Sequence, residues 1–210
     1  MIDGVGIVYP VPTPFVSHIK RIDLERNLHM KIFPTEGQKE LLVEHGLHGS
    51  FAATWVNIED INEVARRLEV APEATATCDF PTAMRSYEPS AGTQRVWITR
   101  HAPGWSHILT LSGAMPSSEI LSLNRHRAFE LACNGGIDEI YPLSYTYDGV
   151  SDEDFFEVLE YTSYWDDLES RPFMPTAEEL EQYLIIMGRI AGRFYDREWF
   201  ASLGLLCTLP

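Results

Sequence analysis

Basic residues are scarce in this chain of 210 residues: 16 Lys and Arg stand against 31 Asp and Glu, so the formal net charge is −15. Nucleic-acid binding depends on Lys and Arg side chains that displace counterions from phosphates. No stretch concentrates them, since Lys20-Arg21 and residues 125–127 are too short for a footprint. We therefore expect no nucleic-acid partner. The negative charge keeps the chain soluble and also gives a surface suited to a basic protein partner.

Cysteine is also scarce, and the chain has three, Cys78, Cys133 and Cys207. An odd count without close spacing argues against a disulfide framework and against a zinc site built on paired cysteines. No metal and no cofactor are therefore expected. The chain starts Met1-Ile-Asp-Gly4, which lacks the basic start and apolar run of a secretory signal. No apolar run is long enough to cross a bilayer, so we expect no membrane partner and a cytoplasmic location.

The nucleotide-binding and hydrolase motifs with a known mechanism are missing. The sequence contains no Gly-x-x-x-x-Gly-Lys-Ser/Thr, no Gly-x-Gly-x-x-Gly, no Gly-x-Ser-x-Gly and no His-Glu-x-x-His. This argues against a nucleotide-dependent enzyme, an α/β-hydrolase and a zinc protease.

What is present is a regular pattern of short apolar segments. Short apolar or alternating segments predict five strands, at 51–56, 95–101, 105–112, 128–134 and 137–147. Turn residues such as Pro103-Gly104 separate them. The pattern predicts an α+β fold, with an antiparallel sheet of about five strands and helices packed on one face.

Helical spacing is clearest after residue 175. Thr176 and Glu179 form a capping box, and a stripe from Leu180 to Phe194 follows at helical spacing. Asp196 is expected to cap a shorter helix that includes Trp199 and Leu203. Three further helices are predicted, at 36–46, after an Asn57 N-cap, and at 117–123. Residues 71–94, rich in Pro, Ala, Thr and Ser, are predicted to be a long loop.

The domain organisation follows from this pattern. Residues 1–50 are expected to form an N-terminal arm, with spaced prolines, and a short helix. Residues 51–210 are expected to form the α+β domain.

The run Thr54-Trp-Val-Asn-Ile-Glu-Asp-Ile-Asn-Glu-Val-Ala-Arg-Arg-Leu68 resembles the opening of an uncharacterised family found mainly in actinobacteria. The tryptophan-bearing hairpin from Trp105 to Gly113, Leu121-Ser122, Tyr147-Asp-Gly149 and Asp196-Arg-Glu-Trp-Phe200 are similar to later parts of that family. The resemblance spans residues 50–204. It implies a fold and assigns no chemistry to any residue.

Two groups of side chains are candidates for function. His101 and His107 flank the predicted Pro103-Gly104 turn and could approach each other as acid–base groups, with Tyr145 as a possible third member. Residues expected to bind a substrate or partner are Trp97, Arg100, Trp105, Tyr141 and Tyr147. The tyrosines at 141, 145 and 147 are two or four residues apart, so we expect them on one face of their strand. Both groups could instead be cross-strand pairs and ordinary core.

These observations favour a non-catalytic, acidic protein-binding module, for example an immunity-like protein that neutralises a basic partner. The alternative is a small-molecule enzyme or accessory protein of bacterial specialised metabolism, with a pocket of His, Tyr and Trp under residues 71–94. A deep aromatic pocket holding a histidine with a tyrosine or carboxylate partner would favour the enzyme. A flat acidic face would favour the binding module, and a large exposed apolar patch would favour a structural subunit.

Overall fold

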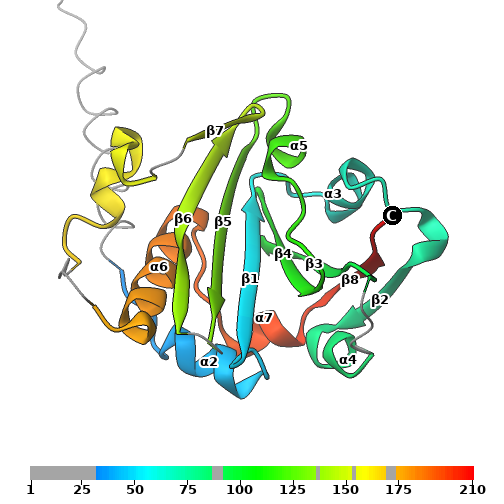
Figure 1. Ribbon diagram of the computed structural model, residues 1–210, viewed down its shortest axis with the longest axis horizontal. Coiled ribbons are helices and arrows are strands. Elements are labelled where there is room, and N and C mark those ends of the chain that lie inside the picture. The colour runs from blue at the N-terminus through cyan, green and yellow to red at the C-terminus, as the bar shows by residue number, and fades with distance from the viewer. Residues whose placement is uncertain (1–31, 87–91, 136–137, 153–154, 169–173) are drawn as a thin grey trace, which may run out of the picture.

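The computed structural model describes residues 32–86, 92–135, 138–152, 155–168 and 174–210. It contains eight strands, namely β1 (Ser50–Val56), β2 (Thr75–Asp79), β3 (Arg95–Ala102), β4 (Trp105–Ser112), β5 (Arg127–Asn134), β6 (Glu139–Tyr147), β7 (Val150–Asp152) and β8 (Leu203–Thr208). All of them join one antiparallel sheet in the order β2-β8-β3-β4-β1-β5-β6-β7. Figure 1 shows this sheet, with β7 at one side and β2 at the other.

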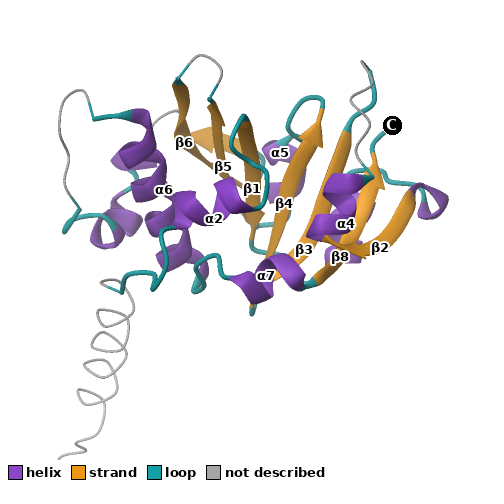
Figure 2. Cartoon of the chain, turned by 90° about the horizontal axis from the view of Figure 1, so that it is seen from below, coloured by secondary structure: helices purple, strands orange, loops and turns teal. Residues whose placement is uncertain are grey.

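The helices are α2 (Gln38–Glu44), α3 (Ile61–Arg67), α4 (Phe80–Arg85), α5 (Ser118–Ser122), α6 (Thr176–Ala191) and α7 (Arg197–Ala201). Three short 3₁₀ segments accompany them, η1 (Pro72–Ala74), η2 (Phe155–Glu157) and η3 (Leu159–Tyr164). In Figure 2, α6, α2, α7 and α4 follow one another along the sheet. The α+β class predicted from the sequence is confirmed.

Helices cover both faces of the sheet, so the prediction of helices on one face is wrong. The apolar side chains of α2, α4, α6 and α7 share one core with Trp97 of β3. Those of α3 and α5 share a second core with Ile98, the next residue along the same strand. Because neighbouring strand residues point to opposite faces, the two cores lie on opposite sides of the sheet. The unbroken apolar run Val96-Trp-Ile98, all fully buried, is typical of a strand covered on both faces.

The sheet is also larger than the five strands predicted, because β2, β7 and β8 were not recognised. β2 lies inside the segment expected to be a loop, which also contains η1 and α4. Leu203 begins β8 and is not part of the helix capped by Asp196. Both β2 and β7 are edge strands of five residues or fewer. Strands this short carry little periodic signal, and pairing with a neighbour decides their conformation.

The helix caps predicted from the sequence are confirmed in part. Asp196 caps α7 by accepting a hydrogen bond from the Trp199 amide, as predicted. Asp60, not Asn57, caps α3. The capping box of Thr176 and Glu179 does not form, because Pro175 occupies the N-cap position and the Thr176 hydroxyl donates to the Asp138 carbonyl.

Leu41 and Leu42 of α2 are buried in the same core as the sheet, so this short helix packs directly on the domain. The proline-spaced part of the expected arm, residues 1–31, lies outside the described residues. Within the part of the chain that the structure describes, no helix has the length and apolar character needed to cross a membrane.

Candidate functional site

The strongest grouping of predicted residues is the pair His101 and His107. β3 and β4 form a hairpin through a turn at Pro103 and Gly104, as the sequence predicts. The two imidazole centroids lie 5.5 Å apart on the face of the sheet that carries Trp97. The hairpin therefore brings together the two histidines that the sequence placed on either side of a turn.

Tyr195, in the connection between α6 and α7, completes the group. Its phenolic oxygen lies 2.6 Å from Nε2 of His107, and the two groups form a buried hydrogen bond. The ring Nε2–H of His101 donates to the carbonyl of Arg193 at 2.8 Å. Nε2 of the neutral His101 ring therefore carries the proton and Nδ1 is an acceptor.

Burial sets the protonation of these groups. It lowers the pKa of His101 to about 4, and it lowers the pKa of His107 well below its usual range, with a smaller contribution from His101. The same burial raises the pKa of Tyr195. Both imidazoles are consequently neutral and the phenol is protonated at pH 7.

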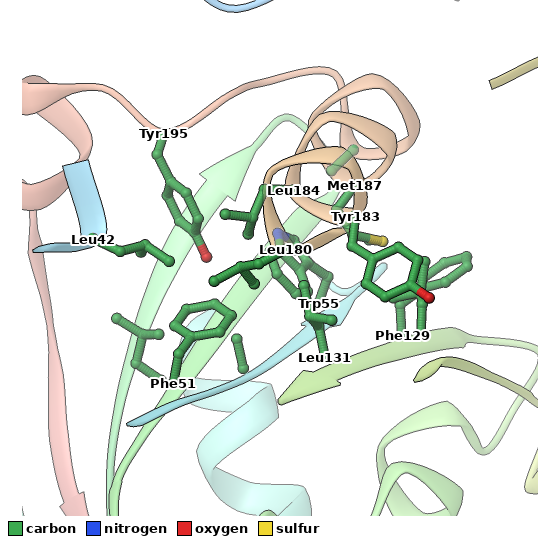
Figure 3. Close-up of a cluster of buried hydrophobic side chains, with 14 of the residues drawn as sticks. Leu42, Phe51, Trp55, Phe129, Leu131, Leu180, Tyr183, Leu184, Met187 and Tyr195 are labelled. Carbon is green, nitrogen blue, oxygen red and sulfur yellow. The ribbon is translucent and has the colours of Figure 1, made fainter. Parts of the chain in front are cut away.

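Two tryptophans enclose the pair. The rings of Trp55 and Trp199 meet His107 edge-on, at centroid distances of 4.5 and 5.0 Å. Figure 3 shows Trp55 and Tyr195 among the apolar side chains that α2, α6 and the sheet contribute. His107 is fully buried and His101 is 2% exposed. The arrangement is a sealed cluster of polar and aromatic rings, in which a substrate cannot reach His107.

A cavity of about 430 Å³ lies beside this cluster. It forms because β3 continues beyond Thr99, the last β3 residue that pairs with β8. Its lining includes Thr99, Arg100, His101, Gly192, Arg193 and Ser202. Among the described residues that line this cavity, the sealed cluster is represented by His101.

Tyr145, Tyr141 and Tyr147 do not form one group. Tyr145 pairs with Phe129 across β5 and packs in the core against Phe129 and Tyr161, away from the histidines. A register shift in the β5–β6 ladder lies between this pair and Tyr141, which pairs with Ala132 on the opposite face. A β-bulge inserts one residue and reverses the alternation, so the prediction that the three tyrosines share a face is wrong. Tyr141 and Tyr147 are both exposed.

The other three predicted binding residues are also dispersed. Trp97 is fully buried and its ring N–H donates to the Cys78 carbonyl, so it acts as core. Arg100 is exposed and forms an ion pair with Glu59. Trp105 is partly buried against Phe129. Trp97 packs edge-on against Trp199, one of the two tryptophans that enclose the histidines, and Arg100 lines the adjoining cavity.

Sequence reasoning missed Tyr195, Arg193 and Gln38. The buried Gln38 side chain receives the Tyr195 amide hydrogen at 2.7 Å and donates to the Tyr195 carbonyl at 3.1 Å, which fixes the position of the phenol. These residues lie about 90 to 160 positions from their partners, as the separations of 88, 92 and 157 residues show. No local pattern could have revealed them.

A second feature is the uneven distribution of charge. Residues 152–181, here called the acidic segment, contain eleven Asp and Glu and one Arg, so their net charge is 1 − 11 = −10. They supply two-thirds of the charge of the whole chain. In the described part of the segment, Phe155 and Tyr161 point into the core, whereas Glu157, Leu159 and Glu160 are exposed. Leu159 is 87% exposed, the largest exposed fraction among the large apolar side chains described.

Arg189 of α6 fastens the acidic segment to the domain. Its guanidinium is buried, pairs with the Asp167 carboxylate at 2.7 Å, and donates to the Tyr164 and Ile32 carbonyls. The Phe33 ring lies 4.7 Å from this guanidinium. The acidic segment is thus held by a specific buried contact.

Metal-ligating side chains do not gather in the described residues, where no group of three or more His, Cys, Asp and Glu could hold a metal ion. No family model, no curated protein and no solved structure matches this chain. The resemblance to an actinobacterial family stays a prediction, and the site is interpreted from its geometry alone.

Proposed function

We propose that this protein is a non-catalytic binding module whose acidic segment docks a basic protein partner. A role of this kind, immunity-like or otherwise neutralising, requires a persistent surface and no reaction chemistry. The observation that carries the proposal is the concentration of two-thirds of the net charge in thirty residues around the exposed Leu159.

Charge and apolar exposure contribute in different ways at such a surface. Clustered carboxylates attract a basic partner over a distance of about one Debye length, about 8 Å at physiological salt, and raise the association rate. An exposed leucine supplies apolar area that docking would remove from water. Leu159 lies between Glu157 and Glu160 in the sequence, so η2 and η3 offer both contributions at one place.

The alternative, an enzyme or accessory protein of specialised metabolism, receives less support from the geometry. It would need His101 and His107 to meet a substrate, and both are at most 2% exposed. His107 does have the tyrosine partner that such an enzyme would use, but Tyr195 is equally buried. Tyr145, its third candidate, packs elsewhere in the core.

The test compares two double variants as bait in a lysate of the source organism. Glu157→Gln with Leu159→Ser changes the docking surface, whereas Ile120→Ser with Glu198→Gln changes one exposed apolar and one exposed acidic residue elsewhere. We expect the unmodified chain and the control variant to retain a basic protein from the lysate, and raised salt to release it. The variant with Glu157→Gln and Leu159→Ser should fail to retain this protein. Equal retention by both variants, or retention that salt does not affect, would refute the proposal.

A further inference from the structure

We propose that the cavity at the end of β3 binds a small anion, carboxylate or phosphate, through Arg193 and Arg100. This inference is independent of η2 and η3, which contact β6 and α6, whereas the cavity lies at the end of β3 next to β8. The volume of about 430 Å³ is within the range of small-molecule sites, about 300–1,000 Å³.

The charges of the lining identify the class of ligand. Arg100 and Arg193 are the only charged side chains among the described residues that line the cavity, and no carboxylate is among them. This is unexpected in a chain where acids outnumber bases by 31 to 16. His101 is neutral at pH 7 because burial lowers its pKa to about 4, so it adds no charge. The cavity therefore presents two guanidinium groups, and the carboxylates that pair with them, Glu59 with Arg100 and Asp196 with Arg193, do not belong to its lining.

Arg193 is held in place by contacts from two directions. Asp196 receives hydrogen bonds from Nε at 3.2 Å and from Nη2 at 2.9 Å. The ring N–H of His101 donates to the Arg193 carbonyl, and the His101 carbonyl accepts from Nη1 of Arg193 at 3.4 Å. The guanidinium plane is thus fixed before any ligand binds, which reduces the entropy cost of binding.

This arrangement leaves one donor of Arg193 available. A guanidinium has five N–H groups. Both Asp196 oxygens accept from Nη2, one of them also accepts from Nε, and the His101 carbonyl accepts from Nη1. The second N–H on Nη1 can donate a charge-assisted hydrogen bond to one oxygen of a carboxylate or phosphate.

Two hydroxyl groups make the rest of the cavity lining polar. The Thr99 hydroxyl lies 3.2 Å from the Ser202 hydroxyl and donates to the Leu203 carbonyl. The Ser202 hydroxyl donates to the Trp199 carbonyl. Each hydroxyl oxygen keeps a lone pair and contributes to a polar wall, and the backbone at Gly192 adds no side chain. The space fits a compact ligand better than a long apolar one.

The proposal is tested by ¹H–¹⁵N correlation spectra of the full chain during titration with sodium succinate, with sodium phosphate, and with uncharged glycerol at constant ionic strength. The probes are raised to about 10 mM, tenfold above a millimolar Kd. We expect one of the two anions to shift the amides of Gly192 and Ser202 and the Nε–H of Arg193. The anion that binds more tightly identifies the carboxylate or the phosphate class.

Three arginine variants complete the test. Arg193→Gln and Arg100→Gln should each weaken anion binding about tenfold or more, because each removes a charge-assisted donor. Arg66→Gln is the matched control, because Arg66 also pairs with a carboxylate three residues away, that of Glu63, but on the exposed surface of α3. It should leave the affinity unchanged. If Arg193→Gln loses its fold, the exposed Arg100→Gln decides the question. The proposal fails if neither anion shifts these signals, if glycerol shifts them equally, or if folded Arg193→Gln and Arg100→Gln bind as tightly as the unmodified chain.

Discussion

Nε2 of His107 and the phenolic oxygen of Tyr195 lie 2.6 Å apart in the interior of the protein, where neither residue is more than 4% exposed. This hydrogen bond joins β4 to the connection after α6. It links segments 88 residues apart in the sequence. The bond therefore fixes where the chain after α6 returns to the sheet.

Replacing Tyr195 by Phe removes the hydroxyl and leaves Nε2 of a buried imidazole without its partner. An unsatisfied buried polar group costs about 1–3 kcal/mol, so the free energy of unfolding should fall by about that amount while the fold is kept. Urea denaturation followed by tryptophan fluorescence measures it. Tyr147→Phe, at an exposed tyrosine, should change stability by less than about 0.5 kcal/mol. An equal effect of the two variants would show that the bond contributes nothing specific.

Stability should decrease on acidification between pH 6.5 and 4. The folded-state pKa of His101 is about 4, and that of His107 is also below the ordinary value of 6.5. The unfolded chain therefore binds more protons in this interval, and the neutral form that the fold requires is lost as pH falls. Each histidine contributes a slope of up to about 1.4 kcal/mol per pH unit. Urea unfolding at several pH values measures the slope, and His101→Asn should reduce it. A slope that this substitution leaves unchanged would contradict the assignment.

Arg189→Met should be strongly destabilising. The substitution removes the buried guanidinium that pairs with the Asp167 carboxylate, and it removes the donor to the Tyr164 and Ile32 carbonyls. Breaking a buried ion pair in this way costs about 3–5 kcal/mol. Thermal unfolding should show a large fall in Tm, whereas Arg66→Met, which breaks an exposed pair, should cost about 1 kcal/mol or less. Comparable Tm values for the two variants would mean that Arg189 does not anchor the acidic segment.

Gly204→Ala should disrupt the contact between β8 and β3. A Cβ at Gly204 would lie 2.6 Å from the Ile98 carbonyl oxygen and 2.7 Å from the Trp97 ring, which are both parts of the buried sheet. Overpacking of this kind costs about 1–3 kcal/mol. Gly49→Ala is the control, because its Cβ would meet no atom within 4 Å. Denaturant midpoints measure both, and a Gly204→Ala midpoint equal to that of the control would exclude a close approach of the strands.

Much of the fold could be predicted where a segment carries its own signal. The hairpin of β3 and β4 follows from two apolar segments around Pro103-Gly104. The stripe that begins at Leu180 predicts α6, although the helix ends at Ala191 with Gly192 as its C-cap and does not reach Phe194. β2 and β8 could not be predicted in this way. Each is five or six residues long, and each is a strand through its pairing with neighbours, β8 with β3 and β2 with β8.

The candidate site was predicted only in its local part. The turn brought His101 and His107 together as expected, because they are separated by six positions on one hairpin. The bulge in β6 displaced Tyr141 from the face of Tyr145, since one extra residue reverses the alternation. Neither Tyr195 nor Arg193 could be associated with the histidines from the sequence.

The sequence by itself determined the α+β class, the strong negative charge and the local hairpin, because composition and short-range periodicity are properties of neighbouring residues. Only the tertiary structure decided that helices cover both faces, that His107 meets Tyr195, and that a cavity lined by two arginines opens beyond Thr99. These features depend on contacts between segments that are distant in the chain. Such contacts form when the segments bury apolar surface together, and no single segment encodes that outcome.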